Sequence, residues 1–253
     1  MGKLHRLNEN AYGTTRLFHL SNVGVNAGSI VTKNSIIYID AGMTVADGKS
    51  LLVQSSKEAK KKENLFLILT HHHSDHIFGM RVFREAGAKV IAHENVRKFL
   101  SHRTLPLFQN SLTTYRPFII RLMVRKLSYT KEKAEEILGD VKLFLPDKTF
   151  TEDTSLQIDG DSILLLHTPG HVPSEITVYH PKSKTLFAGD TIYEGMPLNT
   201  KFGGQKEWRM WIQSLEKLDE LDIETIVPGH GRICGRDEIQ RNITYLEDLL
   251  NKQ

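Results

Sequence analysis

The 253-residue sequence has very few of the features that mark secreted or membrane proteins. Cys234 is the single cysteine, so no disulfide forms within the chain, which fits a reducing compartment. No apolar run approaches the roughly 18 residues that a membrane-spanning helix needs, and the first twenty residues lack the apolar core of a signal peptide. The sequence therefore predicts a cytoplasmic protein without a transmembrane segment.

An excess of charge of one sign is also missing. The formal net charge is +3 although 25% of the residues are charged, and this imbalance is too small to argue for a nucleic acid partner. No internal repeat or low-complexity tract is present. Hydrophobic residues make up 40% of the chain, enough to bury one substantial core. We therefore expect a single domain over residues 1–253.

Two β-rich halves are visible in the pattern of apolar residues. Short β-like runs separated by turn residues fill the first forty positions, and "LFLILT" (65–70) reads as a continuous buried strand. The second half contains the strand-like runs "ILLLH", "EITVYHP" and "TLFAGD". Helical spacing of apolar residues occurs at 44–62, 77–86, 94–103, 131–140, 207–221 and 237–250. The pattern predicts two packed sheets with helices on the outer faces.

The segment "THHHSDH" (70–76) follows the first of these buried strands directly. His71, His73, Asp75 and His76 lie on a turn past the strand, where a rigid scaffold can direct them into one pocket. We expect the remaining two polar side chains, His72 and Ser74, to point elsewhere.

Three similar signals follow later in the chain. His171 comes after a Pro-Gly turn in "HTPGH", Asp190 ends the run "TLFAGD", and His230 comes after a Pro-Gly turn in "IVPGH". A single histidine is more often a core or surface residue than a ligand, but the whole set at strand ends is hard to explain by chance. Imidazole and carboxylate groups suit zinc, iron or manganese, and no cysteine stands among them to favour a softer metal.

With His-x-His-x-Asp-His followed by a distant His, an Asp and a final His, the chain resembles the metallo-β-lactamase superfamily. The resemblance implies an α+β fold, an αββα sandwich with the metal site at one edge between the sheets. It also implies that His71, His73 and His171 hold one metal ion, that Asp75, His76 and His230 hold a second, and that Asp190 bridges the two.

Two divalent cations, zinc being favoured over iron or manganese, would explain the chemistry. Cations roughly 3.5 to 4 Å apart lower the pKa of a bridging water towards about 7, so that hydroxide attacks the substrate at neutral pH. Asp75 has a second predicted role, as a catalytic residue that orients or deprotonates this water. Asp40, at the end of "IIYID", is expected to support a metal ligand from behind or, alternatively, to cap a turn.

Tyr193 is the other predicted catalytic residue. Its offset of three from Asp190 resembles that of the tyrosine which acyl-homoserine lactonases use near the scissile carbonyl. We expect its hydroxyl to donate a hydrogen bond to the developing oxyanion. An aromatic residue that merely packs at the rim would look the same in the sequence.

These features favour a dinuclear metal-dependent hydrolase that cleaves an ester, thioester or lactone of a small molecule. Asp190 argues against true β-lactamases, which usually have Cys or Ser there. Hydroxyacylglutathione hydrolases carry a C-terminal helical domain, whereas only about 20 residues follow His230. A phosphodiesterase or nuclease of the same fold and a non-catalytic metal-binding regulatory protein are the alternatives.

Residues 97–142 differ from the rest and are interpreted as a helical insertion. They contain ten Lys/Arg against four Asp/Glu, together with five aromatic residues. The superfamily places substrate-determining segments around the metal edge, so we favour a lid over an anionic or amphiphilic substrate. A homodimer interface, a shallow membrane contact and a plain solvated hairpin are the other interpretations.

Overall fold

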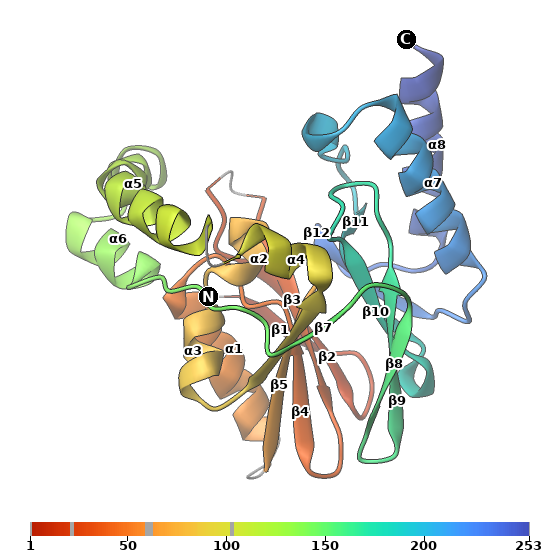
Figure 1. The fold of residues 1–253 in the computed structure, drawn as a ribbon, viewed down its shortest axis with the longest axis horizontal. Coiled ribbons are helices and arrows are strands. Elements are labelled where there is room, and N and C mark those ends of the chain that lie inside the picture. The colour runs from red at the N-terminus through yellow and green to blue at the C-terminus, as the bar shows by residue number, and fades with distance from the viewer. Residues whose placement is uncertain (1, 21–22, 59–62, 102–103, 253) are drawn as a thin grey trace.

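The computed structural model of the protein describes residues 2–20, 23–58, 63–101 and 104–252. Two β-sheets pack face to face, and helices cover the outer face of each sheet (Figure 1). The predicted αββα sandwich is therefore confirmed. None of the helices in the described ranges is long and apolar enough to cross a membrane.

The first sheet has seven strands in the order in which they occur along the chain. Neighbours from β1 to β4 pair antiparallel, and those from β4 to β7 pair parallel. The strands are Lys3–Arg6 (β1), Ala11–Leu17 (β2), Val25–Val31 (β3), Ser35–Ile39 (β4), Asn64–Leu69 (β5), Lys89–His93 (β6) and Lys148–Phe150 (β7).

The second sheet has five strands in the order β12-β11-β10-β9-β8. Only β11 and β12 pair parallel; the other neighbours are antiparallel. The strands are Thr154–Ile158 (β8), Asp161–His167 (β9), Ile176–His180 (β10), Thr185–Tyr193 (β11) and Thr225–His230 (β12).

The helices of the sandwich belong to two outer layers. Those of the first layer and its loops are Val45–Glu58 (α1), Ser74–Ile77 (α2), Met80–Glu85 (α3) and Glu94–Phe99 (α4). The second layer consists of Gln205–Asp219 (α7) and Asp237–Asn251 (α8). The predicted helix at 44–62 corresponds to α1, and residues 59–62 lie outside the described ranges.

Three apolar cores hold the layers together. Ile37, Ile68 and Phe187 are among the fully buried residues between the two sheets. Phe83 belongs to the core between the first sheet and its helices, and Trp211 to the core beneath α7 and α8. Burial of each such side chain contributes about 1.5 to 3 kcal/mol. β4 is covered on both faces, so all of its residues are buried, and those after Ser35 are apolar or aromatic.

The insertion forms two helices, Thr104–Leu127 (α5) and Lys131–Leu138 (α6), which lie beside the first helical layer (Figure 1). Thr130 caps α6 by accepting a hydrogen bond from the Lys133 N–H, and Gly139, with φ +62°, ends the helix. Residues 102–103 lie outside the described ranges. The described side chains form a small cluster of their own, in which Ile120, Met123, Ala134 and Leu138 pack with Phe18 and Leu20.

Candidate metal centre

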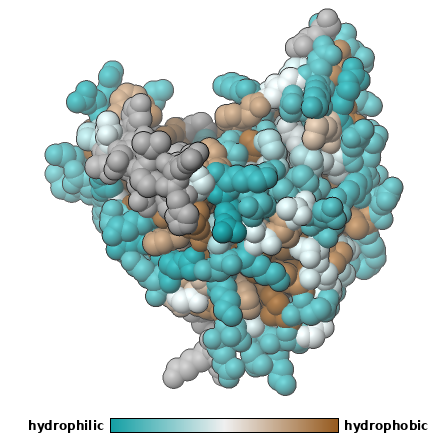
Figure 2. Space-filling view, viewed as in Figure 1, coloured by the Kyte–Doolittle hydropathy of each residue, from teal (hydrophilic) through white to brown (hydrophobic). Residues whose placement is uncertain are grey.

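The turn between β5 and α2 presents the first group of predicted ligands. β5 ends at Leu69, and the Thr70 N–H then donates to Asp40 Oδ1 (2.8 Å). This bond fixes the backbone one residue before His71. The side chains of His71, Asp75 and His76 are buried as a result. The surface is hollowed where the two sheets open at this edge (Figure 2).

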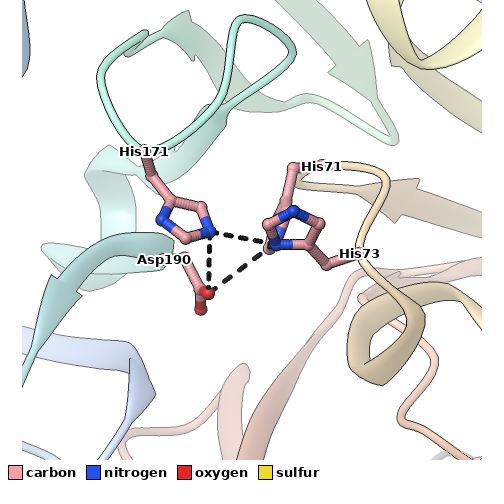
Figure 3. A group of neighbouring side chains, drawn as sticks. All are labelled: His71, His73, His171 and Asp190. Atoms are coloured by element: carbon pink, nitrogen blue, oxygen red, sulfur yellow. Dashed lines mark hydrogen bonds and ion pairs between the residues drawn. The ribbon is translucent and has the colours of Figure 1, made fainter. Parts of the chain in front are cut away.

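The first cluster contains His71, His73, His171 and Asp190, and Figure 3 shows these side chains pointing toward one another. His171 Nε2 lies 3.0 Å from His73 Nδ1 and 3.2 Å from Asp190 Oδ2. His71 Nε2 lies 3.8 Å from the same carboxylate oxygen. One ligand atom from each residue lies within 4.8 Å of the ligand atoms of the other three, close enough for all four to surround one metal ion.

The second cluster contains Asp75, His76 and His230. Asp75 Oδ2 lies 3.4 Å from His230 Nε2 and 3.7 Å from His76 Nε2. The other oxygen of Asp190, Oδ1, lies 3.1 Å from His76 Nε2 and 3.4 Å from His230 Nε2. The two carboxylate oxygens of Asp190 thus face different clusters, as a bridging ligand requires.

Several buried polar atoms at the centre fit a cation. Within the described part of the chain, His71 Nε2, His76 Nε2 and Asp190 Oδ1 are buried and make no hydrogen bond of acceptable geometry. An unpaired polar atom is costly to bury, but a lone pair directed at a metal ion is satisfied. The residues present therefore fit a pair of divalent cations.

In four of the histidines, a neighbouring group contacts the ring nitrogen Nδ1. The other ring nitrogen, Nε2, therefore faces the cluster. These contacts of Nδ1 are His71 with Thr70 Oγ1 (3.1 Å), His76 with Asp40 Oδ2 (2.7 Å), His171 with the Asn199 carbonyl (3.2 Å) and His230 with the Gly24 carbonyl (2.6 Å). The carboxylate of Asp40 also accepts from the Thr70 hydroxyl (2.8 Å), so it supports both clusters. The expectation that Asp40 lies behind a predicted ligand is met.

The two clusters differ in their electrostatics. Burial lowers the pKa of His73 and of His171 to about 4, so both rings are neutral at neutral pH. Burial also acts on His76 and His230, but there the negative charges of Asp190 and Asp75, joined at His76 by Asp40, together outweigh it. The pKa of His76 is raised well above its usual value, and that of His230 is raised to about 10. The second cluster therefore prefers a positive charge.

A cavity of about 450 Å³ opens onto both clusters. Tyr193 lines it, but its hydroxyl donates a hydrogen bond to Asp190 Oδ2 (2.7 Å). The proton that we expected to face an oxyanion is directed at the bridging carboxylate instead. His72 turns away to Ser174, as predicted, whereas Ser74 lines the cavity, so the expectation for Ser74 was wrong.

Close packing beneath Asp190 depends on a glycine. A Cβ atom at Gly229 would collide with Asp190 Oδ1 and with the backbone of Gly189. The Pro-Gly-His segment at the end of β12 therefore passes directly under the carboxylate that the two clusters share.

Sequence reasoning missed Glu175 and His19. Glu175 is fully buried; its Oε1 accepts the Asp190 N–H (3.0 Å), and its Oε2 lies 3.4 Å from His71 Nδ1. Burial, together with the negative charge of Asp190, raises the pKa of Glu175 well above its usual value. His19 lies on the cavity wall. Neither residue belongs to a motif in the sequence, so only the fold reveals them.

Comparisons with known proteins identify the family and agree with the fold. Residues 21–230 match the family described as the metallo-beta-lactamase superfamily. The chain is 22% identical to the linear primary-alkylsulfatase of Pseudomonas sp. over 87% of its own length but only 44% of that protein. It is 28% identical to hydroxyacylglutathione hydrolase GloC of Haemophilus influenzae, over 71% of this chain and 74% of that one. The structure of a metallo-beta-lactamase from Pontibacter korlensis superposes with a TM-score of 0.71 at 20% identity, covering 98% of this chain and all of that one.

Proposed function

The chain belongs to the metallo-beta-lactamase superfamily, a family of metal-dependent hydrolases, and we propose that this protein is a dinuclear hydrolase of carboxylic ester, thioester or lactone bonds in small molecules. The observation that carries the proposal is the position of Asp190, whose two oxygens face two separate clusters of ligand atoms. One carboxylate placed in this way suits two cations that share it.

When bound, a pair of divalent cations supplies an activated water as the nucleophile and polarises the bond under attack. The side chains of the protein then have separate tasks. His71, His73, His171 and Asp190 form the first site, and Asp75, His76 and His230 form the second with the other oxygen of Asp190. Zinc suits this set of nitrogen and oxygen ligands best, with iron or manganese as alternatives.

Asp75 and Tyr193 are the proposed catalytic residues. Asp75 Oδ2 faces the second cluster at the cavity surface, where it can orient the attacking water. Burial raises the pKa of Asp75, but the positive charge of His76 and the hydrogen bond and charge of His230 together outweigh this and hold the pKa at about 2, so the carboxylate is ionised. The Tyr193 hydroxyl steadies Asp190 in this structure and reaches a substrate oxyanion only by exchanging that bond.

The size and lining of the cavity support a small-molecule substrate. A volume of about 450 Å³ admits a small molecule. The lining mixes polar groups of the centre with the apolar side chains of Val23, Met196, Pro197 and Phe202. The names of the relatives add thioesters and alkyl sulfates to the compounds that should be tested.

The test is a panel of carboxylic esters, thioesters, lactones, alkyl sulfates and phosphodiesters, assayed with the metal-replete protein. D190N and H171A serve as inactive controls. We expect turnover of at least one carboxylic ester, thioester or lactone, lost in both variants. Turnover of phosphodiesters alone would establish the phosphodiesterase alternative. Full metal loading without any turnover would favour a regulatory metal-binding protein.

A further inference from the structure

His19 lies at the centre although it belongs to neither cluster. It follows β2 in a loop, and its side chain, 24% exposed, lines the cavity. Its Nε2 atom lies 3.5 Å from Asp75 Oδ2. Its ring meets that of His230 edge-on, with the centroids 5.3 Å apart. The imidazole of His19 therefore borders the part of the cavity beside the second cluster, where it would contact a bound substrate.

The loop is anchored on both sides of His19. The Phe18 N–H donates to Asp47 Oδ1 (3.1 Å), and Asp47 is itself held by the Thr44 hydroxyl (2.7 Å) in the first turn of α1. Further along, the Gly24 carbonyl holds Nδ1 of His230 (2.6 Å). Anchors of this kind keep an imidazole in a defined place relative to the ligands, as a substrate-contacting group requires.

The insertion adds a third anchor. The ring of Phe18 lies 6.4 Å from that of Tyr129 and packs in the apolar cluster of α5 and α6. No side chain described in α5 or α6 lines the metal cavity itself. The contact through Phe18 therefore links the insertion to the cavity by way of the residue next to His19.

Three other polar rings line the cavity and contact the clusters, and that of His230 places Nε2 3.4 Å from Asp75 Oδ2. Tyr193 directs its hydroxyl to Asp190, and His73 places Nδ1 in the first cluster. We propose that His19 is a specificity-determining residue, whose Nε2–H donates a hydrogen bond to a carbonyl or anionic oxygen of the substrate on the Asp75–His230 side of the cavity. This inference rests on the proposed hydrolytic function, because it assigns a contact to the substrate of that site.

The size of the expected effect follows from the nature of the bond. A hydrogen bond to a part of the substrate whose charge does not change during reaction stabilises the bound substrate and the transition state equally. Its loss therefore raises KM, by about tenfold, and leaves kcat nearly unchanged.

The experiment compares His19→Phe, which keeps the ring against His230 but removes the donor, with His19→Gln, whose amide nitrogen reaches about as far as Nε2. His5→Phe is the matched control, because His5 lies on β1 and bonds Thr15 rather than the centre. Each variant is assayed on the best substrate of the panel. Metal content and the binding of inorganic phosphate to the metal-loaded protein are measured in parallel.

We expect His19→Phe to raise KM and the phosphate dissociation constant about tenfold at full metal content, and His19→Gln to restore both to within about threefold. Unchanged KM and phosphate binding in His19→Phe would overturn the inference. Loss of metal from His19→Phe would also overturn it, because His19 would then be a ligand.

The phosphate titration separates this inference from the proposed function. If the wild-type protein hydrolyses nothing in the panel, the proposed function fails, and the comparison of phosphate binding still decides the role of His19. If phosphate also does not bind to the wild-type protein, both are overturned.

Discussion

The two clusters share the carboxylate of Asp190, yet the pKa values of their histidines are shifted in opposite directions. The first is built mainly from buried imidazoles, and burial keeps the pKa of His73 and of His171 at about 4. The second is surrounded by carboxylates, which raise the pKa of His230 to about 10 in spite of its burial. The first cluster therefore offers lone pairs that are ready for a metal, whereas the second attracts positive charge and must release protons to bind a metal.

Removal of the carboxylate that the two clusters share should disrupt both of them and have the largest effect. Asp190→Asn takes away the negative charge that both clusters face. We expect metal content to fall below one ion per chain and kcat/KM to fall by at least about 1,000-fold. Elemental analysis and the panel assay measure these two effects. Retention of two ions per chain in this variant would contradict a bridging role.

Removal of one histidine should damage a single cluster. In His71→Ala we expect the first metal to be lost, the second to remain, and kcat/KM to fall by at least about 100-fold. His72→Ala is the matched control. His72 is next to His71 in the sequence, but its side chain bonds Ser174 outside the centre. We expect that variant to stay within about threefold of the wild type. Equal losses in the two variants would show that the first cluster is not assembled from His71.

Removal of the support behind the second cluster should have a smaller effect. Asp40→Asn removes the charge that holds His76 Nδ1 at 2.7 Å. We expect metal affinity at the second site to fall by about 10- to 100-fold, with the first site less affected. The control is Asp161→Asn, because Asp161 begins β9 at the end of the strand away from His171. Calorimetric titration of the metal-free proteins distinguishes the two sites, and a uniform loss at both would contradict the assignment.

A change of pH should alter metal affinity at the second cluster but hardly at the first. The proton on His230 stabilises the metal-free fold fully below pH 6.5, and this contribution is lost as the pH rises through about 10. A metal ion at the second site must displace the protons of both His230 and His76, so its affinity should fall about 100-fold for each pH unit from pH 8 to pH 6. His73 and His171 titrate near pH 4 and should make the first site nearly insensitive over pH 6 to 8.

Titrations in buffers of different ionisation enthalpy count the protons released. We expect about two from the second site, from His76 and His230, and none from His73 or His171. The same pH dependence at both sites would show that the difference between the clusters is absent in solution.

The sequence predicted the fold class and grouped all seven candidate ligands because each ends or closely follows an apolar, strand-like run, although Asp190 lies within β11 and Asp75 and His76 lie in α2. Parallel or neighbouring strand ends converge on one edge of a sandwich, so short motifs are sufficient to place them. Their assignment as metal ligands stays a prediction until metal is measured. Asp40 was found in the same way, at the end of β4.

The sequence could not predict what depends on distant packing. Glu175 stands alone in "HVPSE", and only the proximity of β10 and β11 shows that it bonds the backbone of Asp190. His19 lies in a loop whose path is fixed by Asp47 and by the insertion. The hydroxyl of Tyr193 is directed by its distance to Asp190, which an offset of three residues does not determine.

The glycine at position 229 has a consequence for the predicted metal centre of this protein. Because it lacks a side chain, the main chain itself forms the floor on which the carboxylate of Asp190 rests. A methyl group at position 229 would displace Oδ1 of Asp190 and rotate the carboxylate, so the position of Oδ2 would change as well. Both clusters would therefore be affected. The geometry of the predicted metal centre thus depends on a residue that belongs to neither cluster.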